Sequence, residues 1–139
     1  MLATLVYAWS ASGGGAQHKL AIHVDDNDAK VMNLALNNAR NVLEYYKAKG
    51  QTVAIEIVTY GPGLHMLRAD TSPVKQRVAE MSMAPEITFA ACGNTRANMT
   101  KQEGKEVPLM SEARLVPSGV VRLMELQESG YAYIRPSGR

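Results

Sequence analysis

Cys92 is the only cysteine of the chain and the residue with the sharpest chemical potential. It follows a run of apolar and β-branched residues at 87–91, which predicts a buried strand. Gly93, Asn94 and Thr95 come next, and a helix is expected to begin there. A thiol between the end of a strand and the start of a helix faces unpaired backbone N–H groups, which favour thiolate over thiol. Because the thiolate is the reactive form, this placement predicts a sulfur nucleophile or carrier.

Nearby charges would change the reactivity of that thiol. Arg96 or Lys101 would stabilise the thiolate, whereas Asp25 and Asp26 would raise the thiol pKa if they lay close to it. No histidine or lysine is adjacent to Cys92 in the sequence. The alternative is that the side chain is a small buried hydrophobe, as most free cysteines are.

An acidic loop at residues 25–28 is the second candidate site. Its three aspartates and Asn27 are residue types that bind metal ions or act as an acid/base pair. The same residue types are favoured at helix starts and in turns, so a capped helix with a solvated turn is the alternative. We expect Asp25 to be the member that faces the crevice.

Of the three histidines, His65 is the better partner for Cys92. It follows a Gly-Pro-Gly turn at 61–63 and could reach the same face of the sheet, with a surface-loop histidine as the alternative. His23 is expected to lie in the core or at an interface, and His18 is uninformative. Signature motifs for zinc proteolysis, dithiol redox chemistry, nucleotide binding and serine hydrolysis are absent from the sequence, and we predict no cofactor.

Strands and helices are expected to alternate from residue 19 onward. Apolar residues recur at helical spacing from residue 31 until Gly50 stops the helix, and Ser72-Pro73 is a typical helix start. A helical turn is expected at 64–70, a short helix at 95–102, and a helix between Ser118 and Gly130. The predicted strands are 19–24, 51–59, 87–91, 113–116 and 131–134.

This alternation predicts a three-layer α/β fold with a mostly parallel five-stranded sheet and helices on both faces, in a flavodoxin-like arrangement. In that arrangement the first and third strands lie side by side. The loops at 25–28 and 92–95 would then face each other across a crevice at the carboxyl ends of the strands, which is where such folds bind ligands.

Length and composition indicate one globular domain, at residues 18–139 of the 139-residue chain. The formal net charge is only +2, and the basic residues do not gather into a stripe, so nucleic acid is not an expected partner.

Residues 1–17 form a separate apolar and Ser/Gly-rich segment that resembles part of a secretory signal peptide. The protein would be periplasmic if that segment is an export signal and cytoplasmic otherwise. The alternative is an arm that packs on a neighbouring subunit. The segment is too short for stable membrane insertion, which takes about 20 apolar residues.

Four sequence segments together resemble the DsrE/DsrF-like family, also called YchN-like. They are 24–28 (VDDND), 60–63 (YGPG), 91–95 (ACGNT) and a region from SGVVRL at 118–123 to GYAYIRP at 130–136. The likeness covers residues 19–136 and is strongest to the small single-domain members, many of which follow an export signal. It implies a three-layer fold and a homo-oligomer, commonly a trimer or hexamer. In the sulfur-relay members a crevice cysteine accepts sulfur as a persulfide, and Cys92 is the residue that would inherit this role.

The leading prediction is therefore a sulfur carrier or sulfurtransferase-like protein that exchanges sulfur with a partner protein or a small sulfane-sulfur compound. A non-enzymatic oligomeric module for ligand binding or assembly, with a structural cysteine, is the alternative. A metal site built from Asp25, His65 and Cys92 is a third hypothesis with scattered ligands. The residues expected around the reacting sulfur are Gly93, Asn94, Thr95, Arg96, Asp25, Asn27 and His65.

Overall fold

The computed structural model describes residues 15–138 of the chain. The predicted export signal falls mainly on residues 1–14, which lie outside the described part. Within residues 15–138 no helix has the length and apolar character needed to cross a membrane.

All five strands run parallel in one sheet, which confirms the predicted fold class. The spatial order is β4-β3-β2-β1-β5. The strands are β1 (His18–Val24), β2 (Val53–Thr59), β3 (Ile87–Cys92), β4 (Ala113–Val116) and β5 (Ala132–Ile134).

The predicted neighbourhood of the first and third strands is wrong, because β2 lies between them. The chain adds β2, β3 and β4 one after another on the same side of β1, and only β5 returns to the other side. All seven residues of β2 are buried, as expected for a central strand. Within this strand, Glu56 predicts either an edge position or a paired carboxylate, and the second is found: the Arg122 guanidinium binds it at 2.6 and 2.7 Å.

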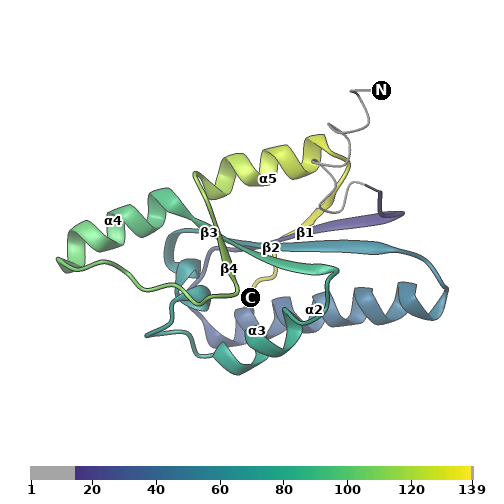
Figure 1. Cartoon of the computed structure of the whole chain (residues 1–139), viewed down its shortest axis with the longest axis horizontal. Coiled ribbons are helices and arrows are strands. Elements are labelled where there is room, and N and C mark those ends of the chain that lie inside the picture. The colour runs from purple at the N-terminus through teal and green to yellow at the C-terminus, as the bar shows by residue number, and fades with distance from the viewer. Residues whose placement is uncertain (1–14, 139) are drawn as a thin grey trace.

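Two helices and a 3-10 helix cover one face of the sheet, and one helix covers the other (Figure 1). The first group is α2 (Ala29–Ala48), η1 (Gly61–Leu67) and α3 (Lys75–Met81), and the opposite face carries α5 (Gly119–Glu128). The remaining helix, α4 (Gly93–Glu103), continues from β3 beyond the carboxyl edge of the sheet (Figure 1). The first turns of α4 and α5 therefore both lie at the carboxyl edge of the sheet.

Alternation of side chains along the strands produces two apolar layers. The larger layer packs Ile22, Ile57 and Phe89 against Met32 and Leu36 of α2. The smaller layer lies under α5 and includes Ala21, Val58 and Ala90 from the strands with Leu123 and Leu126 from the helix. Cys92 and His23 are two residues beyond Ala90 and Ala21, so they lie on the α5 face.

Side-chain caps explain where the helices begin. Asp28 Oδ1 accepts a 2.8 Å hydrogen bond from the Lys30 N–H and caps α2, and Ser118 Oγ caps α5. The start predicted at Ser72 is displaced, because its hydroxyl accepts from the Val74 N–H in a turn and α3 begins only at Lys75. The helix predicted from Thr95 begins earlier, at Gly93, because Cys92 itself is the cap.

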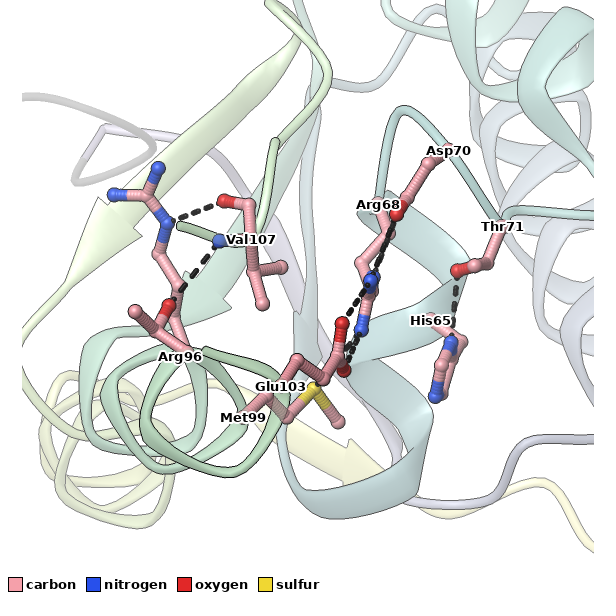
Figure 2. A network of polar contacts seen from close by, with 9 residues as sticks. His65, Arg68, Asp70, Thr71, Arg96, Met99, Glu103 and Val107 are labelled. Carbon is pink, nitrogen blue, oxygen red and sulfur yellow. Dashed lines mark hydrogen bonds and ion pairs between the residues drawn. The ribbon is translucent and has the colours of Figure 1, made fainter. Parts of the chain in front are cut away.

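A buried arginine holds α4 against the loop after η1. The Arg68 side chain is 2% exposed and binds Glu103 at 2.7 and 2.9 Å and Asp70 at 2.8 and 2.9 Å. Figure 2 shows its guanidinium between the two carboxylates. Because α4 has no buried residue, this pairing and the contacts at its first turn position the helix.

Candidate functional site

Cys92 lines a pocket at the carboxyl edge of the sheet, although its side chain is only 4% exposed. The pocket has a volume of about 370 Å³. It lies where β2 and β3 end and where α4 and α5 begin. The lining residues are Tyr60, Cys92, Asn94, Thr95, Ser118 and Val120, none of which carries a charged side chain.

Backbone N–H groups from two helix starts are directed at the Cys92 sulfur. The Thr95 N–H of α4 donates to Sγ over 3.4 Å. The Asn94 N–H, which donates to the Pro117 carbonyl oxygen at 3.2 Å, and the Gly119 N–H of α5 also favour the thiolate. Burial raises the pKa of the Cys92 thiol, but the Thr95 hydroxyl and these three N–H groups outweigh it, so the pKa lies below its ordinary value. The two helix dipoles add to this preference for thiolate. Of the predicted donors Gly93, Asn94 and Thr95, the structure directs the Thr95 N–H to the sulfur, and Gly119 lies near it as a residue that was not predicted.

Two glycines allow the helix starts to come this close. A Cβ atom on Gly119 would lie 2.8 and 2.9 Å from Tyr60 side-chain atoms and 3.2 Å from the Cys92 Cβ. A Cβ atom on Gly93 would lie 2.9 Å from the Val116 carbonyl oxygen. A larger residue at either position would push α5 or α4 away from the sulfur.

Tyr60 forms the wall of the pocket on the β1 side. Its ring centroid is 4.4 Å from that of His23, and burial and the nearby Asp25 carboxylate raise the pKa of its phenol. The phenol is therefore neutral at physiological pH. The next residue, Gly61, donates its N–H to Thr95 Oγ1 at 2.9 Å, which joins the end of β2 to the start of α4.

Asp25 and Asn27 do not line the Cys92 pocket. Asp25 accepts hydrogen bonds from Arg135 at 3.1 Å, and Asn27 is exposed. The two loops do not face each other directly, because the end of β2 and Tyr60 lie between them. Within the acidic loop, Asp28 caps α2, which is the helix-start role that its residue type favours.

Arg96 and His65 are also directed elsewhere. Arg96 donates to the Val107 carbonyl oxygen and to Glu106, both at 2.8 Å, so its charge is neutralised away from the sulfur. His65 Nδ1 lies 2.7 Å from Thr71 Oγ1, beside the Arg68 network (Figure 2). The structure brings neither of these two predicted residues to Cys92.

Metal binding gains no support from this arrangement. Among residues 15–138, no group of three or more His, Cys, Asp or Glu side chains could hold a metal ion. The hypothetical set of Asp25, His65 and Cys92 is divided among the Arg135 ion pair, the Thr71 hydrogen bond and the pocket.

Sequence reasoning missed Tyr60, Ser118, Gly119 and Val120 as parts of the site. Their signal was present, because Tyr60 ends a strand before Gly-Pro-Gly and Ser118-Gly119 opens a helix after another strand. In an all-parallel sheet these positions share the edge at which Cys92 lies. The correct strand order was required to bring them to one pocket.

Comparison with known proteins supports the fold. No family model matches the chain, and no curated protein matches it. A solved structure of MTH1491 from Methanobacterium thermoautotrophicum, described as a protein of unknown function, is similar with a TM-score of 0.72. The sequences are 31% identical, and the match covers 86% of this chain and 100% of that one. The two proteins share their α/β fold.

Chemically, the pocket is arranged to hold a sulfur anion. The Thr95 N–H donates to Sγ, and the Thr95 hydroxyl and the N–H groups of Asn94 and Gly119 further favour the anion. With no charged side chain in its lining, stabilisation of the anion depends on neutral donors and helix dipoles.

Proposed function

We propose that this protein is a sulfur carrier or sulfurtransferase-like protein that holds sulfur as a persulfide on Cys92. The observation that carries the proposal is the convergence of the first turns of α4 and α5 on one sulfur atom that lines a pocket. A structural cysteine needs neither a pocket nor donors from a second helix. The resemblance to sulfur-relay members of the DsrE/DsrF-like family supports the same chemistry.

In the first step the Cys92 thiolate attacks the outer sulfur of a donor persulfide, R–S–SH. A new S–S bond forms to Cys92 while the donor S–S bond breaks, and its electron pair leaves with R–S⁻. In the second step an acceptor thiolate attacks the outer sulfur on Cys92, and the Cys92 thiolate leaves. One sulfur atom moves in each step, and no external oxidant or reductant is needed.

The N–H donors suit both steps. A good leaving group is a stabilised anion, and the groups that lower the pKa of the Cys92 thiol also make its thiolate leave more readily when the acceptor attacks. A second sulfur atom on Sγ would extend into a pocket lined by Asn94 and Ser118. The donor or acceptor is either a partner protein or a small sulfane-sulfur compound.

The proposal includes a homo-oligomer, either a trimer or a hexamer. α5 exposes three apolar side chains, Val120, Val121 and Met124, with exposed fractions of 53%, 47% and 56%. Apolar surface of this kind is common at contacts between subunits. Light scattering on purified protein tests this part, and a monomeric mass at micromolar concentration would contradict it.

A second candidate is a non-enzymatic binding or assembly module with a structural cysteine. The observation in its favour is that Cys92 caps α4 and is 4% exposed, so the sulfur already has a role in holding the helix. Under this alternative Cys92 would resist alkylation in the folded protein at every pH.

Intact-mass spectrometry after treatment with polysulfide or thiosulfate tests the main proposal. We expect a gain of about 32 Da on Cys92 that dithiothreitol removes. The Cys92→Ser variant is the control and should gain nothing. A folded wild-type protein that forms no adduct with either donor would refute the carrier function.

A further inference from the structure

A second group of polar side chains lies on the α5 face at the ends of β1 and β5. It consists of His23, Asp25, Tyr133 and Arg135, which we call the His23 cluster. Arg135 binds the Asp25 carboxylate through contacts of 3.0 and 3.1 Å. His23 Nδ1 is 2.7 Å from the Tyr133 hydroxyl. The proposed sulfur chemistry uses none of these contacts.

The other ring nitrogen of His23 has no hydrogen-bond partner within residues 15–138. The residue is 4% exposed, and its Nε2 faces Asp25 Oδ2 at 3.9 Å, too far for a hydrogen bond. A buried polar atom without a partner is unfavourable and therefore calls for a physical explanation. The Asp25 carboxylate could accept a hydrogen bond from a protonated Nε2, but Arg135 already binds it.

The charged and titratable groups around the ring come from every element packed on it. Asp25 extends from β1, Tyr133 and Arg135 come from β5 and the residue after it, and Tyr60 follows β2. On α5, which covers this face, Arg122 is bound to Glu56 of β2, while Glu125 and Glu128 are exposed. Burial lowers the pKa of His23, Asp25 raises it and Arg135 lowers it, with a net decrease. The ring is therefore neutral in the structure at neutral pH.

We propose that His23 and Arg135 compete for the Asp25 carboxylate, so that the cluster is a pH-sensitive latch on the segment after β5. With His23 neutral, Asp25 binds Arg135 and holds the segment at residues 135–138 against the start of α2, where Gly138 lies close to Asp28 and Val31. When His23 takes a proton from solvent, both ring nitrogens carry hydrogen and Nε2 becomes a charged donor that faces the same carboxylate. The Arg135 ion pair then weakens, and the segment is released.

NMR on the labelled full chain tests this latch. The first readout is the titration midpoint of the His23 ring, and the second is the exchange rate of the Arg135 Nε–H with water. The exchange rate is divided by that of Arg40, an exposed arginine on α2, to remove the intrinsic effect of pH. We expect the Arg135 protection to fall as pH decreases, with the same midpoint as the His23 ring.

Two variants at the ion pair make the test specific. Arg135→Gln should raise the His23 midpoint, Asp25→Asn should lower it, and the control Arg40→Gln should leave it unchanged. Because Arg135 is half exposed, its loss is compatible with folding, and the wild-type measurement does not depend on any variant. The latch is refuted if Arg135 protection does not follow the His23 midpoint, or if Arg135→Gln leaves that midpoint unchanged.

Discussion

Gly119→Ala should reduce the reactivity of Cys92 without touching the cysteine itself. The added Cβ atom would lie 2.8 Å from Tyr60 Cδ2 and 2.9 Å from Tyr60 Cβ, both shorter than normal contact distances. Either Tyr60 or the start of α5 must therefore shift by several tenths of an ångström. Because the Tyr60 Cβ is fixed to its backbone at the end of β2, we expect the start of α5 to shift, which moves the Gly119 N–H away from the Cys92 sulfur and raises the thiol pKa.

The expected magnitude follows from the value of one hydrogen bond to a charged group. Such a bond contributes about 1.5–3 kcal/mol, but Thr95 and Asn94 still donate to the sulfur and the helix moves only slightly. A loss near the lower limit, about 1.4 kcal/mol, corresponds to roughly a tenfold lower thiolate population at a pH below the pKa. We therefore expect alkylation by iodoacetamide at neutral pH to slow about tenfold.

Alkylation rates measured by intact-mass spectrometry, with circular dichroism to verify folding, provide the assay. Gln127→Ala is the matched control, because it alters an exposed side chain of the same helix outside the apolar surface. Its rate should equal that of the wild type. If folded Gly119→Ala reacts as fast as the control, the N–H groups of α5 do not stabilise the thiolate and the reasoning is wrong.

Three further predictions concern the pocket and its supports. Thr95→Val should also slow alkylation of Cys92, because it removes the hydroxyl that favours the thiolate and accepts a hydrogen bond from the Gly61 N–H. The same alkylation assay checks this prediction, and an unchanged rate would contradict it. Arg122→Leu should destabilise the protein by about 3 kcal/mol in urea unfolding, because it leaves the buried Glu56 carboxylate without its partner. The double variant with Glu56→Gln should recover part of that loss, and an additive further loss would refute the pairing argument. The lowered pKa of His23 means that the unfolded chain binds its proton more readily, so stability is full above about pH 6.5 and falls as pH decreases through the folded pKa. His23→Gln should remove this part of the pH dependence of the urea midpoint. If the midpoint changes with pH as much as in the wild type, other groups cause the dependence.

The elements of the fold were predictable because their signals are local. Strand positions follow from runs such as 53–59 and 87–92, and the cap at Asp28 sets the start of α2. The order of the strands was not predictable from these signals, because either β2 or β3 could lie beside β1 under the same crossover rules. The nearly continuous apolar run at 53–58, interrupted only by Glu56, was the available sequence clue to the central position of β2.

Within the site, the sequence predicted the sulfur and the helix that follows it but not the wall opposite. Cys92 and Thr95 are neighbours along the chain, so their contact is a local property. Tyr60 and Gly119 reach the sulfur only through the packing of β2 and α5. Arg96 was misassigned because its direction depends on the Val107 carbonyl oxygen, a contact that its helical position does not reveal.

The central claim is that the Cys92 sulfur is a stabilised thiolate, and its ionisation can be measured directly. Thiolate absorbance in the ultraviolet, recorded against pH and corrected with Cys92→Ser, gives the pKa of this one thiol. We expect ionisation at a pKa below the value of about 8.5 for a free cysteine. A pKa at or above that value would contradict it, because the N–H groups of α4 and α5 would then fail to outweigh burial.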